Sequence, residues 1–210
     1  MNHSEKEHTS LDITIIVDRS GSMESIREDA IGSFNAFLSD QKKQEPDAIM
    51  TLVLFDDEVD VIYNAVPIAN IPPLTKETFV PRGSTALLDA IGRTIGAIQS
   101  RPAKNQSILV AILTDGEENA SCEWGLNQIR EKINELEDLG WDFCYLSSDL
   151  NAFTDAVRMG FKPGKIYQSH GADMKGAYDN ISEEILKKKL LMQKHWREEQ
   201  APPEEDKMFQ

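Results

Sequence analysis

The sequence predicts an α/β fold with three layers: a doubly wound, mostly parallel sheet with one antiparallel edge strand and helices on both faces. Three apolar, β-branched runs, at residues 11–17, 49–55 and 106–113, are typical of strands buried on both faces of a sheet. Amphipathic segments with helical spacing lie between these runs. This alternation of strand and helix favours a parallel sheet that is covered by helices on both sides.

Shorter patterns predict the remaining elements. Residues 56–58 form a turn into a partly alternating run at 59–63, which predicts an antiparallel partner strand at the sheet edge. Residues 64–84 carry several prolines and little periodicity, and they predict a long surface loop. Further strands are expected at 141–146 and 165–167, and helices at 23–41, after 85, through 126–136, at 152–159 and at 174–197. The residues of the last helix that are expected to face the core are Ile181, Ile185, Leu186 and Leu190.

Length and charge limit the organisation and the partners. The 210 residues fit one domain, which we place at 11–197, with a disordered N-terminus at 1–10 and a disordered acidic tail at 198–210. The formal net charge of -14 repels phosphate backbones and anionic membranes, so neither nucleic acid nor a membrane is expected as a partner. The first residues lack the pattern of a signal peptide, and a cytoplasmic location is expected.

Short oxygen-bearing side chains follow two of the buried strands and one loop. Asp18, Ser20 and Ser22 come directly after the first strand, and Asp115 follows the strand at 106–113. Thr85 lies at the junction between the long loop and the next helix. Right-handed crossovers place the carboxyl ends of parallel strands at one rim of the sheet, so these five residues are expected to meet there.

Each of these segments also has a purely structural explanation when it is taken alone. Asp18 can form an Asx-turn, Ser20 or Ser22 can cap a helix, and Thr85 can be a helix N-cap. Asp115 and the following glycine are a common turn sequence. The joint pattern outweighs these alternatives, because three independent segments would each have to place an oxygen at the same rim by accident.

The chemistry of the five residues points to a hard cation. Two carboxylates and three hydroxyls form an all-oxygen set, which suits Mg²⁺, Mn²⁺ or Ca²⁺ and suits zinc poorly. We expect Mg²⁺, with Mn²⁺ and Ca²⁺ as the alternatives. Without a cation, Asp18 and Asp115 would repel one another, and the pKa of one of them would rise.

With these residues in place, the sequence resembles a von Willebrand factor type A domain with a metal-ion-dependent adhesion site. Asp18-x-Ser20-x-Ser22 matches the first metal loop of that family, Thr85 its isolated threonine, and Thr114-Asp115-Gly116 its second aspartate loop. The resemblance covers roughly residues 12–194 and is greatest to small stand-alone intracellular bacterial and phage members. It implies a Rossmann-like fold and a cation held directly by Ser20 and Ser22. Thr85 would bind directly or through water, while Asp18 and Asp115 would act mainly through water or hydrogen bonds.

The resemblance implies a metal-dependent protein-binding module rather than an enzyme. A partner protein would complete the coordination of the cation with a Glu or Asp carboxylate. The alternative is a metal-dependent hydrolase or phosphatase that uses the same cation to activate water. Arg19 and Arg82 flank the site and could pair with acidic groups of such a partner, but we expect them to be solvated surface residues. Residues 117–119 could select the partner, but we expect them to be hydrated as well. The sequence leaves the oligomeric state open.

Overall fold

The structure, a computed structural model, describes residues 10–45, 47–102, 106–148, 151–168 and 173–200. Of the ends predicted to be disordered, at 1–10 and 198–210, residues 1–9 and 201–210 lie outside the described residues, whereas Ser10 begins the first strand. Within the described residues, the sheet has six strands in the order β3-β2-β1-β4-β5-β6. The strands are β1 (Ser10–Asp18), β2 (Ile49–Phe55), β3 (Val59–Pro67), β4 (Gln106–Thr114), β5 (Asp142–Ser147) and β6 (Ile166–Gln168). Among the strand pairs that the structure describes, only β2–β3 is antiparallel, so the predicted mixed, mostly parallel sheet is confirmed.

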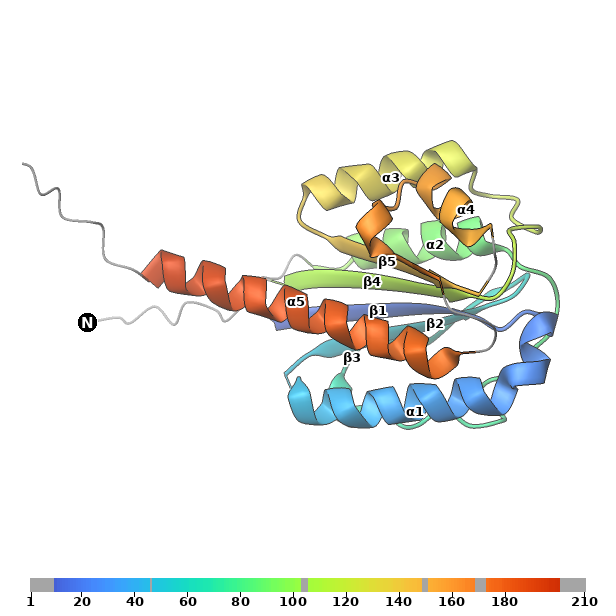
Figure 1. Ribbon diagram of the computed structural model, residues 1–210, viewed down its shortest axis with the longest axis horizontal. Helices are drawn as coiled ribbons and strands as arrows, with labels where there is room; N and C mark the ends of the chain where they lie inside the picture. Colours follow the sequence, from blue (N-terminus) through green and yellow to red (C-terminus); the bar gives the residue numbers. More distant parts are fainter. Residues whose placement is uncertain (1–9, 46, 103–105, 149–150, 169–172, 201–210) are drawn as a thin grey trace, which may run out of the picture.

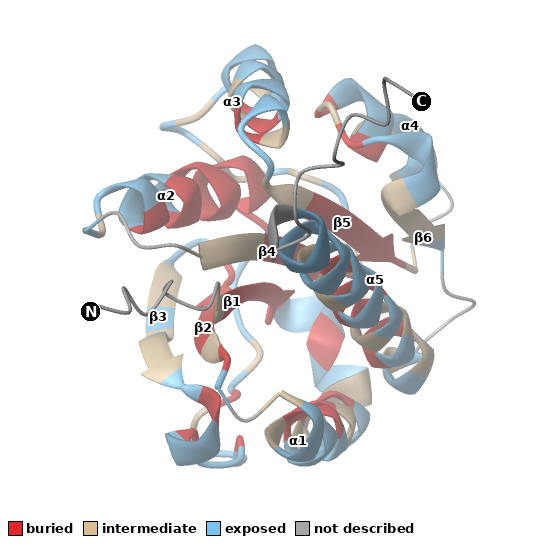
Figure 2. Ribbon diagram, turned by 90° about the vertical axis from the view of Figure 1, so that its left-hand side faces the viewer, coloured by how far each residue is buried: buried red, intermediate tan, exposed pale blue. Residues whose placement is uncertain are grey.

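Helices cover both faces of this sheet (Figures 1 and 2). On one face lie α1 (Arg27–Gln44) and α5 (Met174–Gln200), and on the other lie α2 (Leu87–Gln99), α3 (Leu126–Asp138) and α4 (Ala152–Arg158). Short 3₁₀ turns occur at η1 (Gly21–Ile26), η2 (Ile68–Asn70) and η3 (Pro163–Lys165). The three-layer architecture that the sequence predicts is therefore confirmed.

The central strand β1 is buried on both of its faces. Ile13, Ile15 and Val17 pack into the core beneath α1 and α5, while Ile16 packs into the core beneath α2, α3 and α4. All four side chains are almost completely buried, and burying each one contributes roughly 1.5–3 kcal/mol. Because both faces of β1 are covered, its carboxyl end can reach solvent only at the rim.

Two predictions about connecting segments differ from the structure. The helix predicted at 23–41 begins with the 3₁₀ turn η1, and its α-helical part starts only at Arg27. The predicted surface loop at 64–84 continues β3 through Pro67, and four of its apolar side chains are buried. These buried residues are Ile68, Ile71, Leu74 and Phe79. The loop therefore closes one side of the core while it carries the chain toward the rim.

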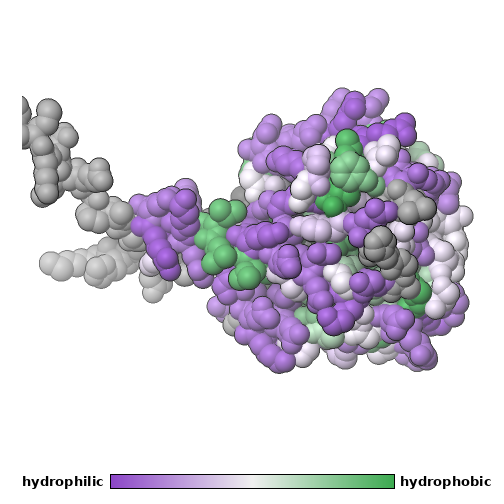
Figure 3. Space-filling model, viewed as in Figure 1, coloured by the Kyte–Doolittle hydropathy of each residue, from purple (hydrophilic) through white to green (hydrophobic). Residues whose placement is uncertain are grey.

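For the second half of the last helix, the sequence predicted the wrong residues to face the core. Ile181 and Ile185 are buried as expected, but Leu186 and Leu190 are 53% and 56% exposed. Successive helical residues are rotated by about 100°, so residues one and five positions after Ile185 point away from the sheet. Figure 1 shows that α5 also runs past the end of the sheet, and Figure 3 shows an apolar patch on that part of the helix. The helix continues to Gln200, so residues 198–200 are helical. In the described part of the chain, no helix has the length and apolar character needed to cross a membrane.

Ala65 provides a test of the backbone of β3. Its φ of 51° lies in the left-handed region, next to the register shift between β2 and β3. A side chain costs about 1–2 kcal/mol in this conformation, whereas glycine adopts it freely. Ala65→Gly is therefore expected to raise the free energy of unfolding by about 0.5–1 kcal/mol in a urea titration. The control is Ala97→Gly on the exposed side of α2. This variant is expected to lower the free energy of unfolding by about 1 kcal/mol. A loss at both positions would contradict the assigned backbone conformation.

Glu184 is expected to make the free energy of unfolding depend on pH in the acidic range. It is buried on α5 and accepts hydrogen bonds from Lys165, from Lys187 at 2.8 Å and from Tyr167 at 2.5 Å. Burial raises its pKa, but the two lysines and the tyrosine outweigh burial and hold the pKa below its usual value of 4.5. The stabilisation is therefore present above pH 4.5 and is lost as the pH falls through the lowered pKa.

Glu184→Gln is expected to lower the free energy of unfolding by about 2–3 kcal/mol at pH 7. The difference from the unsubstituted protein should shrink as the pH falls below 4.5. Denaturant titrations at several pH values measure this difference in the free energy of unfolding. Glu183→Gln, on the exposed side of α5, is the control. A difference that does not change with pH would contradict the role of the carboxylate.

Candidate metal site

Asp18 ends β1 with its carboxylate completely buried. One oxygen, Oδ1, accepts the backbone N–H of Ser20 at 2.6 Å, which is the Asx-turn that the sequence suggested. The other oxygen, Oδ2, accepts the hydroxyl of Thr114 at the end of β4, also at 2.6 Å. The carboxylate therefore joins the carboxyl ends of the two central strands.

The two serines of the first loop place their hydroxyls side by side. Ser20 Oγ and Ser22 Oγ lie 3.0 Å apart, and Ser22 Oγ donates to Asp115 Oδ1 at 2.8 Å. Ser20 precedes η1 as its N-cap residue but makes no side-chain capping hydrogen bond. Both hydroxyls are thus turned to the rim rather than to the helix, and Ser22 is exposed there.

Thr85 reaches the same place from the loop before α2. The helix N-cap is Ala86, so the capping role suggested for Thr85 is not what the structure shows. The Thr85 N–H donates to Asn119 Oδ1 at 2.9 Å, and its carbonyl accepts the Asn119 N–H at 3.0 Å. A Cβ added to Gly116 would lie 3.6 Å from the Thr85 hydroxyl, so this hydroxyl lies beside the residue that follows Asp115.

The structure therefore brings all five predicted residues to one rim of the sheet. Direct hydrogen bonds join Ser22 to Asp115, and the two loops that carry Asp18 and Asp115 are bridged through Thr114. The assignment of the five as metal ligands stays a prediction.

Burial dominates the electrostatics of the site. It raises the pKa of Asp18 to about 6, although hydrogen bonds from Thr114 and Ser20 lower it, and the negative charge of Asp115 adds to the rise. Burial also raises the pKa of Asp115, against the hydrogen bond from Ser22. Keeping both carboxylates ionised at pH 7 therefore costs free energy, and a bound cation would offset that cost.

The donor set fits a hard divalent ion. In the regions that the structure describes, no group of three or more His, Cys, Asp or Glu side chains is placed to hold a metal. The rim instead combines two carboxylates with three hydroxyls, which is an oxygen environment of low charge. Ser20, Ser22 and Thr85 would hold the ion, with Asp18 and Asp115 beside them.

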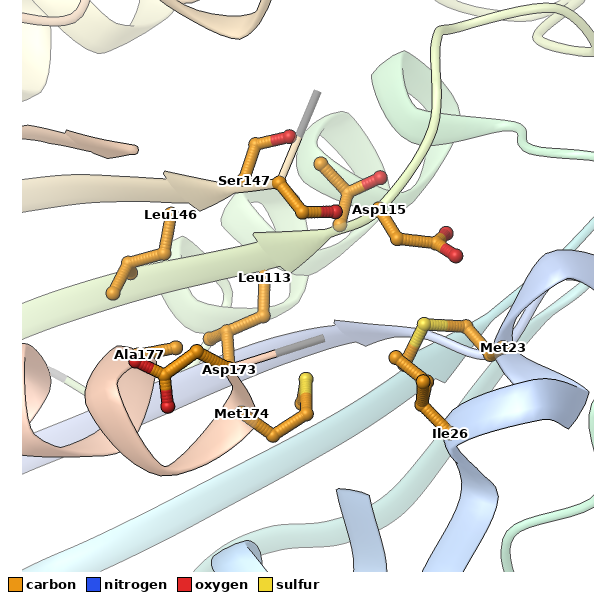
Figure 4. Close-up of a pocket in the computed structure, with 11 residues that line it drawn as sticks. Met23, Ile26, Leu113, Asp115, Leu146, Ser147, Asp173, Met174 and Ala177 are labelled. Atoms are coloured by element: carbon orange, nitrogen blue, oxygen red, sulfur yellow. The ribbon is translucent and has the colours of Figure 1, made fainter. Parts of the chain in front are cut away.

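A pocket lies beneath the rim, between the ends of β4 and β5, η1 and the start of α5 (Figure 4). The residues that line it are Met23, Ile26, Leu113, Thr114, Asp115, Leu146, Ser147, Ser148, Asp173, Met174 and Ala177. In Figure 4, Asp115 extends from the loop after β4 toward the turn that carries Met23. The mostly apolar lining keeps water from one side of Asp115, which agrees with the burial that raises its pKa.

The arginines beside the site have other roles than the sequence predicted. Arg19 was expected to be solvated, but it is 5% exposed and forms ion pairs with Asp56 at 2.9 Å and Asp60 at 2.5 Å. Arg82 is half exposed and pairs with Asp56 at 2.8 Å and with Glu58. Burial raises the pKa of Asp56, but both arginines and the Glu58 N–H outweigh it and hold that pKa below its usual value. The prediction was wrong for Arg19, because its burial depends on carboxylates in and just before β3, far along the sequence.

Two residues of the loop after Asp115, Glu118 and Asn119, form hydrogen bonds to neighbouring segments. Glu118 accepts the N–H of Leu88 at 2.9 Å and that of Ser121 at 2.7 Å, which satisfies a free donor at the start of α2. Asn119 holds the backbone of Thr85. The prediction of hydration missed the bonds of Glu118, whereas Glu117 and Asn119 are exposed as expected. The structure also gives Asn119 a supporting place beside Thr85. The sequence signal was an amide close after a predicted metal loop.

No protein-family model matches this sequence, and neither does any curated protein. Solved structures do match. The von Willebrand factor domain of the type V pili tip protein Mfa5 from Porphyromonas gingivalis is 12% identical, with a TM-score of 0.65 over 85% of this chain and 95% of that chain. A von Willebrand factor type A protein from Catenulispora acidiphila is 15% identical, with a TM-score of 0.56 over 82% of this chain and 42% of that one.

A third match is the proximal thread matrix protein 1 of the mussel byssus, in a structure with a zinc-occupied MIDAS motif. It is 11% identical, with a TM-score of 0.59 over 81% of this chain, and the match spans 46% of the mussel chain, or about half its length. These similarities show that the chain has the von Willebrand factor type A fold, as the sequence resemblance implied.

Proposed function

We propose that this chain is a metal-dependent protein-binding module whose partner supplies a Glu or Asp carboxylate to a divalent cation at the rim. The observation that carries the proposal is the convergence of three loops on one rim, where Ser22 is hydrogen-bonded to Asp115 and exposed to solvent. Ser22 gives the site a face that is open to solvent, while Asp18, Ser20 and Thr85 are buried beneath it.

The residues of the site would have different roles in binding the cation. Ser20, Ser22 and Thr85 would hold the cation, and Asp18 would keep the first loop in shape through its bonds to Ser20 and Thr114. The cation would supply a positive charge that these mostly neutral ligands leave unsatisfied, so a carboxylate from outside is attracted to it. Asp115 would orient Ser22 by accepting a hydrogen bond from its hydroxyl group.

The similar structures support the class of function. One is a domain of a pilus tip protein, and another is a byssus matrix protein with zinc at its MIDAS. Zinc at that site of the mussel protein weakens the sequence argument against zinc, so Mg²⁺ as the ion here is part of the proposal. The expected cytoplasmic location is also part of the proposal.

Affinity capture tests the proposal. The full chain is used as bait in a native lysate, once with Mg²⁺ and once with a chelator, beside the Thr85→Ala variant. The expected result is a partner that is retained with Mg²⁺ and lost in both other samples. Adding free Glu-containing peptides should compete with this partner. Capture that is indifferent to metal would contradict the proposed mechanism.

We propose no catalytic role, because the acidic groups are poorly placed to activate water. Both oxygens of Asp18 are buried and already accept hydrogen bonds, and Asp115 already accepts one from Ser22. The check is turnover of generic phosphoesters with Mg²⁺ or Mn²⁺, which we expect to be absent. Activity that Asp115→Ala abolishes would favour the hydrolase alternative.

A further inference from the structure

Asp56 lies at the centre of a buried ion-pair cluster next to the candidate metal site. It follows β2 directly, and its side chain is completely buried. Its Oδ2 atom accepts Arg19 Nε at 2.9 Å and Arg82 Nε at 2.8 Å, while Oδ1 accepts the Glu58 N–H at 2.7 Å. One carboxylate therefore satisfies two guanidinium groups that come from two different loops.

These two loops are the ones that carry the metal-ligand candidates. Arg19 stands between Asp18 and Ser20, and Arg82 lies three positions before Thr85. The backbone joins the loops as well, since the Arg82 N–H donates to the Arg19 carbonyl at 2.9 Å. Asp56 therefore contacts both the first loop and the loop that leads to Thr85.

Further backbone contacts of Asp56 and its neighbours hold the same arrangement. The Asp56 carbonyl accepts the Ala86 N–H at 2.8 Å, directly after Thr85. The Gly21 N–H donates to the Gly83 carbonyl at 3.2 Å. Gly83 has a φ of 65°, and a Cβ there would lie 1.8 Å from Asp57 Oδ1, so only glycine allows this close approach.

We propose that Asp56 is a positioning residue for the metal site, which sets the spacing between the Ser20–Ser22 hydroxyls and the Thr85 hydroxyl by holding Arg19 and Arg82. This inference rests on the proposed function, because it assumes that these hydroxyls bind a cation. Groups that orient metal ligands without touching the metal commonly change metal affinity 10- to 100-fold.

The test is a Mg²⁺ titration by isothermal titration calorimetry on the full chain. Asp56→Asn keeps the size of the side chain but removes its charge, and it is expected to weaken Mg²⁺ binding about 10- to 100-fold. The control is Asp12→Asn at the opposite end of β1. Asp12 is equally buried and pairs with Arg101 at 2.9 Å, far from the rim along the strand. This control should lower thermal stability but change Mg²⁺ affinity by less than about two-fold.

A second variant covers the case that Asp56→Asn does not fold, which circular dichroism would show. Arg82→Lys keeps the positive charge at a half-exposed position but loses the paired N–H groups that contact Asp56 and Glu58. It is expected to weaken Mg²⁺ binding about 10-fold.

The outcomes separate the inference from the proposed function. If the unsubstituted protein binds Mg²⁺ and the Asp56 and Arg82 variants bind it equally well, the positioning role is wrong while the proposed function stands. If Asp12→Asn weakens binding as much as Asp56→Asn does, metal affinity follows general stability and the positioning role is again wrong. If the unsubstituted protein binds no Mg²⁺, both fail.

Discussion

Asp115→Asn is expected to weaken Mg²⁺ binding by at least about 100-fold and to abolish metal-dependent capture of a partner. The substitution keeps the size of the side chain but removes the charge beside Ser22, whose hydroxyl donates to Asp115 Oδ1 at 2.8 Å. The melting temperature without metal should not fall, because the charge of Asp115 contributes to the raised pKa of Asp18 and therefore opposes its ionisation.

The measurement is the shift in melting temperature on addition of Mg²⁺, which rises with ligand concentration only when the folded state binds the ion. The control is Glu117→Gln, two positions further along the same loop and exposed. This variant should keep the full Mg²⁺-dependent shift. An equal loss of the shift in both variants would show that the general charge of the rim, rather than Asp115, attracts the metal.

Phe34→Ala is expected to lower the free energy of unfolding by about 3–5 kcal/mol, which is a large part of the stability of a typical domain. Phe34 is completely buried on α1, and its ring meets Tyr178 of α5 edge-on at 5.9 Å between ring centroids. Removing the ring leaves a cavity between the two helices that cover one face of the sheet. Since the cavity is remote from the rim, the folded variant should still bind Mg²⁺.

Chemical denaturation with guanidinium chloride measures this loss. Phe153→Ala provides the matched control, because Phe153 is 47% exposed on α4 and the same atoms are removed. Its expected effect is within about 0.5 kcal/mol. Equal effects at the two positions would contradict the packing of α1 against α5.

The strands could be predicted closely because burial on both faces leaves an unambiguous apolar signature. The run at 49–55 became β2 with the same bounds, and the run at 106–113 became β4 with one further residue. The alternation of strands and helices then placed Asp18 and Asp115 at one rim without any structural information. For the same reason, five residues from three distant segments could be proposed together.

The support around the site could not be predicted, because it depends on contacts across the fold. Arg19 resembles any charged loop residue in the sequence, and its burial is explained by two carboxylates, Asp56 and Asp60, that lie 37 and 41 positions later. The inner face of α5 failed for a different reason: Leu186 and Leu190 lie on the side of the helix that is turned away from the sheet, although Ile185 and Lys188 beside them are buried. Local patterns predict the elements and their ends, but not which polar groups other strands bring to them.

The central claim is that the rim holds a divalent cation between the loops after β1 and β4 and the loop before α2. A crystal structure of the full chain grown with Mn²⁺, with diffraction recorded at the manganese absorption edge, tests it most directly. We expect one anomalous peak in contact with the hydroxyls of Ser20 and Ser22. Crystals with Mn²⁺ that show no peak at these hydroxyls, or a peak only elsewhere on the molecule, would contradict it.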